Sequence, residues 1–97
     1  MIVSFKDAGT RDVFFSNDTR RARATCPRIL WLAARERLDQ IQTATRLTEL
    51  AERRGNRLKP LQEDRFGQFS LRINDQYRVC FRWEQGRAED VEIVDYH

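Results

Sequence analysis

The spacing of hydrophobic residues changes near residue 56, from the three-to-four-residue interval of amphipathic helices to the two-residue interval of strands. Upstream, the pattern predicts a helix that begins near Pro27, a residue suited to a first helical turn. It predicts a second helix over 44–52 that ends at Gly55 and Asn56. The positions expected to face inward are Leu30, Ala34, Leu38, Ile41, Leu47, Leu50 and Ala51, with Trp31 flanking the first stripe.

The N-terminal part of the chain predicts a short strand over 1–5 and a helix over 8–15 that is capped by Asp7. The segment 16–25 has no hydrophobic period, so we expect a loop there. This loop carries the basic residues Arg20, Arg21 and Arg23. A flexible basic segment favours contact with RNA of any sequence. A solvated loop, or a dock for an acidic partner, would have the same composition.

Residues 69–83 predict a hairpin with a defined register. The aliphatic and aromatic residues of 69–73 and 77–83 all carry odd numbers. If both sets face one core, the loop must contain an odd number of residues, because a slip of one residue turns every side chain over. The shortest solution is a loop over 74–76, which places Arg72 opposite Arg78. Like charges directly opposite are unfavourable, so we expect a phosphate site, with two solvated arginines leaning apart as the alternative.

A third strand is predicted over 91–94, after a turn at Gly86. The register that continues the alternation of the hairpin sets Arg78 opposite Tyr96, with His97 just past the strand end. Three separate stretches of the chain would then converge on one patch of the open sheet face.

Composition limits the class of protein. The chain has 97 residues, 40% of them hydrophobic, which suits one domain over 1–97 with a modest core. Lys6 and Lys59 are the only lysines among 18 basic residues, and arginine binds phosphate through two parallel hydrogen bonds, although codon bias would also favour arginine. No hydrophobic run suits a signal peptide or a membrane helix. We therefore expect a cytoplasmic protein without membrane contact, in which Cys26 and Cys80 are reduced.

The predicted patch combines phosphate-binding groups with a group that titrates near neutral pH. Two arginines can stabilise a phosphorane-like transition state, His97 can exchange protons, and Tyr96 can stack on a base. One histidine and scattered acids do not make a metal shell, and we expect no cofactor. RNA carries an internal nucleophile, so metal-independent RNA cleavage is predicted. Asp95 would orient the imidazole or be a plain strand-end carboxylate, and His97 would otherwise be an ordinary exposed residue.

The segment NRLKPLQEDRFGQFSLRINDQYRVCFRW, followed by EDVEIVDYH, resembles the plasmid-maintenance killer proteins, the HigB-type toxins of the RelE superfamily. The similarity over 56–97 rests on a K-P-L element, a G-x-x-S-x-R-I-N strand, the returning Y-R pair and the terminal D-Y-H. MIVSFKDAGTRDVFF also resembles the family, whereas 16–55 match it only in length and helical pattern. The resemblance implies an α+β fold, with an N-terminal strand and two to three helices packed on a small, mainly antiparallel sheet.

The resemblance also implies a toxin that enters the A site of the 30S ribosomal subunit and cuts mRNA by attack of the 2′-hydroxyl. It implies a HigA-like helix-turn-helix antitoxin that neutralises the toxin and represses the operon, so the toxin would meet operator DNA only through it. Two alternatives remain open. One is a module that inhibits by occupying the ribosome or the antitoxin, and the other is a ribonuclease that cuts naked RNA.

The resemblance also implies roles for the residues of this chain that match motif positions of the superfamily. Arg72 and Arg78 match the superfamily's arginines that bind phosphate and stabilise the transition state. Tyr96 and His97 match its terminal pair for base stacking and proton transfer, and Asp95 matches the acid before them.

Lys59 and its neighbours depart from the family pattern. Relatives place a histidine or a glutamate at Lys59, which we expect to contact phosphate because lysine is a poor base at pH 7. Relatives often carry a lysine where this chain has Gln62 and Glu63. Arg65 is the candidate to supply the missing charge, and weak cleavage is a further expectation.

Overall fold

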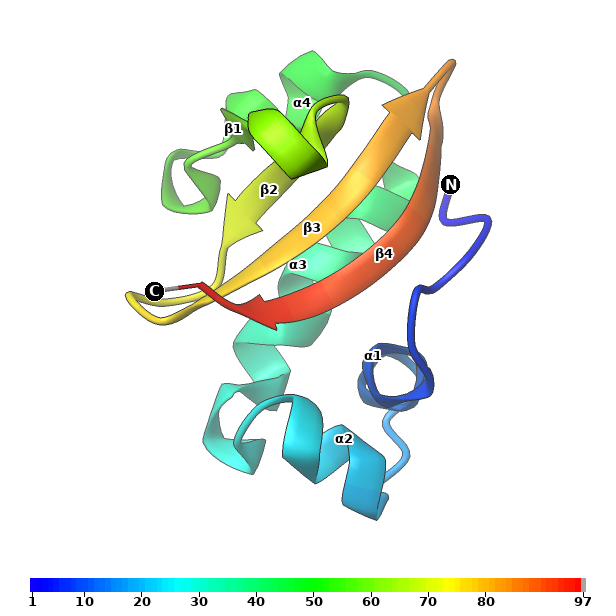
Figure 1. Cartoon of the computed structure of the whole chain (residues 1–97), viewed down its shortest axis with the longest axis vertical. Helices are drawn as coiled ribbons and strands as arrows, with labels where there is room; N and C mark the ends of the chain where they lie inside the picture. The colour runs from blue at the N-terminus through cyan, green and yellow to red at the C-terminus, as the bar shows by residue number, and fades with distance from the viewer. Residues whose placement is uncertain (97) are drawn as a thin grey trace.

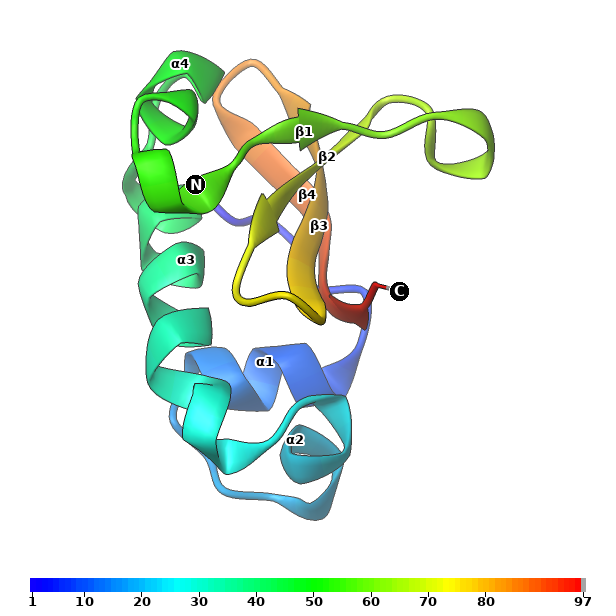
Figure 2. The ribbon, with the colours of Figure 1, turned by 90° about the vertical axis from the view of Figure 1, so that its left-hand side faces the viewer.

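The computed structural model describes residues 1–96, as helices packed on a four-stranded sheet. The helices are α1 (Ala8–Phe14), α2 (Arg20–Thr25), α3 (Trp31–Thr43) and α4 (Leu47–Ala51), and the strands are β1 (Lys59–Pro60), β2 (Gln68–Arg72), β3 (Tyr77–Glu84) and β4 (Arg87–Asp95). The strands lie in the order β1-β2-β3-β4, each antiparallel to the next. Helix α3 covers one face of the sheet, and the segment between β1 and β2 projects on the other side (Figure 1, Figure 2). The predicted α+β fold class is confirmed.

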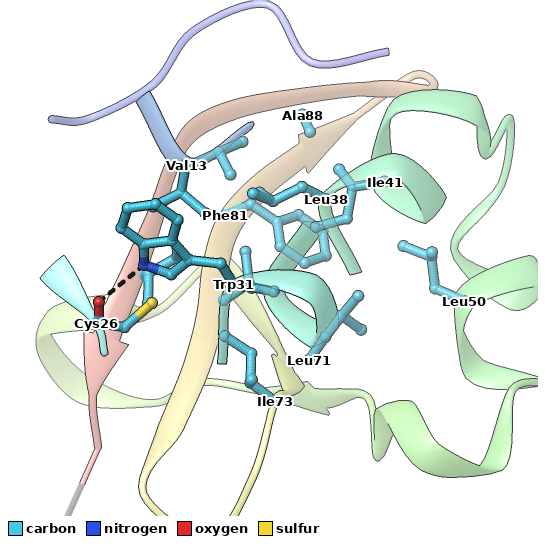
Figure 3. Close-up of a cluster of buried hydrophobic side chains, with 14 of the residues drawn as sticks. Val13, Cys26, Trp31, Leu38, Ile41, Leu50, Leu71, Ile73, Phe81 and Ala88 are labelled. Atoms are coloured by element: carbon cyan, nitrogen blue, oxygen red, sulfur yellow. Dashed lines mark hydrogen bonds between the residues drawn. The ribbon is translucent and has the colours of Figure 1, made fainter. Parts of the chain in front are cut away.

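The hydrophobic core lies between α3 and the odd-numbered residues of β2 and β3, and Ala88, Val91 and Ile93 of β4 extend it. Leu38 and Ile41 of α3 are fully buried in one cluster with Leu71 and Phe81 (Figure 3). Trp31, which the pattern placed beside the helical stripe, is also buried, and its indole Nε1 donates to the carbonyl oxygen of Cys26 at 2.9 Å. The predicted inward positions of the long helix and of the hairpin therefore form one core.

The N-terminal segment runs beside β4. Ile2 and Phe5 form isolated parallel bridges with Ala88 and Val91, so the predicted first strand is present as two points of pairing rather than as a continuous strand. The predicted cap of α1 is confirmed, since the Asp7 carboxylate accepts from the backbone N–H of Thr10 at 2.6 Å. These contacts place α1 at one end of the sheet.

The loop predicted over 16–25 is wrong, because α2 occupies most of it. Thr19 caps α2, and its hydroxyl accepts from the backbone N–H of Ala22 at 3.1 Å. The helix has only six residues and buries only Ala22, so its sequence shows no hydrophobic period. Gly9 lets α2 approach α1 closely, since a Cβ at Gly9 would lie 1.9 Å from the Thr25 hydroxyl oxygen.

Two predictions for the middle of the chain need correction. Helix α4 is shorter than predicted, and Ala51, expected to face inward, is exposed at its end. The two-residue strand β1 was missed because both of its residues are exposed and no alternation marks them. Arg57, two residues before β1, has a left-handed backbone conformation (φ 44°) that reverses the chain toward the sheet edge.

The pairing of β2 with β3 agrees with the prediction, whereas the pairing of β3 with β4 does not. Arg72 pairs with Arg78, and the Ile73 N–H donates to the Tyr77 carbonyl oxygen at 2.9 Å, so the three-residue hairpin loop is confirmed. The second register is wrong, because Arg78 lies opposite Val94 and not Tyr96. The strand predicted over 91–94 begins earlier, at Arg87, since Gln85 and Gly86 alone form the turn after β3. A bulge shifts the pairing between β3 and β4, and Asp90 in the bulged stretch has a positive φ of 53°. Period-two counting cannot detect such an extra residue.

Candidate active site

The candidate site lies on the sheet face opposite α3 (Figure 2). The even-numbered residues of β2 and β3 alternate with the core residues Leu71, Val79 and Phe81, so they point to this face. Arg72 and Arg78 are partners across the hairpin. The Arg72 guanidinium donates through Nη2 to the carboxylate of Asp75 in the hairpin loop. Asp75 is almost fully exposed, so this ion pair is accessible to water and to a competing phosphate.

Arg78 has a different set of partners. Its Nε donates to the Ser70 hydroxyl oxygen at 2.7 Å, and its Nη2 donates to the Arg57 carbonyl oxygen at 2.7 Å and to the Ser70 carbonyl oxygen at 3.4 Å. Burial lowers the pKa of Arg78, the charges of Arg72 and Arg57 act in the same direction, and Cys80 and Tyr96 oppose them. Arginine stays protonated in proteins, so Arg78 holds a positive charge in a partly dry position.

Tyr96 and Lys59 complete the cluster. The Cζ atom of Arg78 lies 6.0 Å from the centre of the Tyr96 ring, and the Nζ atom of Lys59 lies 5.9 Å from it, at the outer limit of a cation–π contact. Pairing of β1 with β2 sets Lys59 opposite Ser70. The structure therefore brings Lys59, Arg72, Arg78 and Tyr96 to the same face, although the predicted register for Tyr96 is wrong.

The hairpin loop holds the end of β4 in place. The Gln76 carbonyl oxygen accepts from the Tyr96 N–H at 2.7 Å, and the Gln76 side-chain amide donates to the Asp95 carboxylate at 3.0 Å. Asn74 fixes the loop itself, because its side-chain oxygen accepts from the backbone N–H groups of Gln76 and Tyr77. His97, predicted to be catalytic, lies outside the described residues.

Arg65 is engaged by acceptors on the sheet. It donates to the Glu92 carboxylate at 2.7 Å and to the Gln68 side chain at 3.1 Å, and the bond to Glu92 raises the pKa of Arg65. Lys6 also lies 3.7 Å from Glu92. Glu92 therefore compensates much of the charge that was expected to replace the family's lysine, and the role of Arg65 in phosphate binding stays a prediction.

The three arginines of α2 lie at the opposite end of the molecule from β1 (Figure 2). Arg21 donates to the Asp12 carboxylate at 2.7 Å, and Arg23 donates to the Asp18 carboxylate at 2.6 Å. The structure does not bring Arg20, Arg21 and Arg23 to the candidate site, and any RNA contact they make would be a separate one.

The two cysteines of the chain, Cys80 on the sheet and Cys26 in the core, are unreactive. Burial raises the pKa of the Cys80 thiol, which lies on the same sheet face, to about 11, and burial raises the pKa of Cys26 to about 11. Both thiols are protonated near pH 7 and are poor nucleophiles. Neither a membrane-spanning helix nor a group of three metal-ligating side chains is present within residues 1–96.

Sequence reasoning missed two groups that contact Arg78, namely the Ser70 hydroxyl and the Arg57 carbonyl. Ser70 was visible as the serine of the G-x-x-S-x-R-I-N strand, where it stands as a fully buried polar residue. The Arg57 carbonyl has no sequence signature, because it depends on a single left-handed residue and on β1.

A small antiparallel sheet that carries clustered arginines on the face opposite its helices is the architecture of a RelE-like toxin. The family model described as "RelE-like toxin of type II toxin-antitoxin system HigB" matches residues 3–97. The chain therefore belongs to the HigB-like toxin family. It is also similar to Endoribonuclease HigB of Proteus vulgaris, with 35% identity over 98 residues that cover 100% of each chain.

Proposed function

We propose that this toxin is an endoribonuclease that enters the ribosomal A site and cuts mRNA there without a metal ion. The observation that carries the proposal is the convergence of Arg72, Arg78, Lys59 and Tyr96 on one sheet face. These groups bind phosphate or stack on bases. The similarity to a protein named as an endoribonuclease supports RNA as the substrate.

In the proposed reaction the ribose 2′-oxygen attacks the adjacent phosphorus. The 2′-hydroxyl gives its proton to a base as the new P–O bond forms. The bond to the 5′-oxygen of the next nucleotide breaks, and that oxygen gains a proton. The products are a 2′,3′-cyclic phosphate and a 5′-hydroxyl. No outside oxidant, reductant or cofactor takes part in this transfer.

Each side chain has a proposed role in that step. Arg78 and Arg72 stabilise charge on the non-bridging oxygens, and Tyr96 stacks on a base next to the cut. Lys59 contacts a phosphate. His97 moves a proton, and Asp95 supports it from the end of β4. The pH dependence of the cleavage rate in variants of Lys59, Tyr96 and His97 assigns the base and the acid.

Basic residues outside the cluster would add nonspecific affinity. Arg20, Arg21 and Arg23 on α2 would contact ribosomal RNA, with the exposed pair of Arg23 and Asp18 open to exchange for a phosphate. Arg65 would act as a further cation near the site. Such contacts weaken as salt increases. Loss of these residues should therefore weaken binding to ribosomes in a salt-dependent way, whereas loss of the groups at the scissile phosphate should lower the cleavage rate.

The proposed partners follow from the family. A HigA-like helix-turn-helix antitoxin would neutralise the toxin in the cytoplasm and carry it to operator DNA, while the ribosome would present the mRNA. The membership in a toxin–antitoxin family supports a dedicated antitoxin.

Primer extension on mRNA after induction of the toxin tests the proposal. Codon-positioned 5′ ends are expected with the native protein and should vanish with Arg78→Ala. Arg87→Ala is the matched control, because Arg87 is an exposed arginine at the far end of β4 from Tyr96. Growth arrest by the native protein without new 5′ ends would contradict cleavage.

A second candidate function is inhibition by occupancy. It is favoured by Glu63 in the segment before β2 and by the pairing of Arg65 with Glu92, since both reduce positive charge near the site. Under this function, translation would stop and ribosomes would stay loaded with intact mRNA. Incubation of purified toxin with naked RNA tests the remaining alternative, a ribonuclease that needs no ribosome.

A further inference from the structure

We propose that Ser70, together with the Arg57 carbonyl, forms a neutral clamp that fixes the Arg78 guanidinium for catalysis, which makes Ser70 a positioning residue of the cleavage reaction. This inference rests on the proposed function, since it concerns the arginine assigned to transition-state stabilisation.

The geometry of the clamp fixes both the position and the plane of the guanidinium. Arg78 Nε donates to the Ser70 hydroxyl, and Arg78 Nη2 donates to the Arg57 carbonyl, each at 2.7 Å. The two acceptors come from different parts of the chain, one on β2 and one before β1. A planar group held at two of its three nitrogens by separate supports cannot rotate about its long axis. Ser70 itself is fully buried, so its hydroxyl has no alternative water partner.

The clamp uses acceptors without charge. A carboxylate in either place would hold Arg78 equally well but would cancel the charge that the phosphate requires. The contrast with Arg72 is direct, since Arg72 is held by the Asp75 carboxylate. Arg78 thus combines a fixed orientation with a charge that no carboxylate within residues 1–96 pairs with, which is the arrangement that stabilises a transition state without reorganisation.

The clamp also leaves the Nη1 atom of the Arg78 guanidinium available to a ligand. Within residues 1–96, no group accepts a hydrogen bond from Arg78 Nη1. Nη1 carries two N–H donors, and the Tyr96 ring lies beside this guanidinium. A phosphate next to a base stacked on Tyr96 would therefore meet donors that are already oriented.

Strand β1 gains a function from this inference. Its pairing with β2 sets Lys59, the proposed phosphate contact, opposite Ser70. The same short edge strand follows Arg57 in the chain and so holds the Arg57 carbonyl within reach of Arg78. The left-handed conformation of Arg57 is a position where glycine fits without strain. The clamp needs the carbonyl of Arg57 and not its side chain, so Arg57→Gly should keep the clamp.

The test compares Ser70→Ala with Ser70→Thr on ribosomes programmed with mRNA. Ser70→Ala should lower the maximal cleavage rate at saturating toxin at least about tenfold, because a loosened guanidinium loses orientation. Half-saturation for ribosomes should stay within about twofold, because clamped and loose arginines attract RNA equally at a distance. Ser70→Thr keeps the hydroxyl and should recover most of the rate. An unchanged maximal rate in Ser70→Ala would overturn the proposal.

A double-mutant cycle separates positioning from general damage to the fold. Arg78→Lys removes Nε, so Ser70→Ala should have no further effect on cleavage in that background. Equal losses in both backgrounds would show that Ser70 acts only through the stability of β2. That result would overturn the positioning role.

Hydrogen exchange of the Arg78 Nε–H by NMR provides a measurement on the native protein, which needs no active ribosome. Slow exchange, with the resonance identified by its loss in Arg78→Lys, is expected for a donor bonded to a buried hydroxyl. Exchange as fast as that of an exposed arginine would overturn the clamp. If the protein fails to cut mRNA yet shows slow exchange, the proposed function falls while the clamp stands.

Discussion

Arg72 and Arg78 are directly opposite each other across the hairpin, yet Arg72 is held by an exposed carboxylate and Arg78 by two neutral acceptors, the buried Ser70 hydroxyl and the exposed Arg57 carbonyl. Both guanidinium groups lie on the same face of the sheet, and each donates hydrogen bonds to different partners. The arrangement gives one arginine that is fixed and one that can exchange its partner. This difference leads to separate predictions for the two residues.

Asp75→Asn should increase cleavage at subsaturating toxin, because it removes the carboxylate that competes with phosphate for Arg72. The gain should be no more than about fivefold, since an exposed ion pair contributes at most about 1 kcal/mol. It should shrink as salt is added. The measurement is the initial cleavage rate on programmed ribosomes at two salt concentrations. Asp39→Asn on α3 makes the same change of charge elsewhere, and an equal gain there would contradict a specific effect on Arg72.

Arg78→Lys should reduce the maximal cleavage rate by about a hundredfold, while toxin binding to ribosomes changes little. Lysine keeps the charge but has neither Nε nor a planar fork, so it cannot use both acceptors of the clamp. Single-turnover cleavage and a ribosome pelleting assay measure the two quantities separately. Arg87→Lys is the control, and wild-type cleavage by Arg78→Lys would show that charge alone suffices.

The hairpin was the most predictable part of the site. The odd-numbered hydrophobic residues set the pairing of Arg72 with Arg78, because a single buried face determines the register. Tyr96 lies beside Arg78 as predicted, but the two residues are not paired across the sheet as the predicted register required. Strand β4 starts at Arg87 after a two-residue turn, and a bulge near Asp90 shifts the pairing by one residue. The Gln76 carbonyl oxygen, which accepts from the Tyr96 N–H, then holds the end of β4 close to Arg78.

The elements that escaped prediction are short and have few buried residues. Helix α2 buries only Ala22, and β1 buries neither of its residues, so neither shows a hydrophobic period. Lys59 could be assigned to the site only through the family resemblance. The Arg57 carbonyl depends on backbone conformation and on strand pairing, which no composition or spacing encodes.

Tyr96→Phe and Tyr96→Ala should differ in a way that assigns the role of the ring. If Tyr96 stacks on a base and attracts the cations of Lys59 and Arg78, the phenylalanine variant should keep most activity and the alanine variant should lose it. If the hydroxyl transfers a proton, both variants should lose activity alike. The single-turnover cleavage rate on programmed ribosomes decides between them. Phe15→Ala serves as the control, because it truncates an exposed aromatic residue on the N-terminal side of the fold.

The contact between Asp12 and α2 should make the helical end of the molecule sensitive to acid. Hydrogen bonds from Arg21 and then from Thr19 lower the pKa of Asp12, both at 2.7 Å. A carboxyl group with a lowered pKa in the folded state stabilises the protein above its unfolded pKa, and this contribution disappears as pH falls through the folded pKa. The free energy of unfolding of the native protein should therefore exceed that of Asp12→Asn by a constant amount above about pH 5. The difference should shrink progressively below about pH 4. Urea unfolding across this pH range measures both, and Asp39→Asn makes the same change of charge at an exposed position on α3 for comparison. A difference that is independent of pH would mean that Asp12 stabilises α2 by shape and packing rather than by its charge.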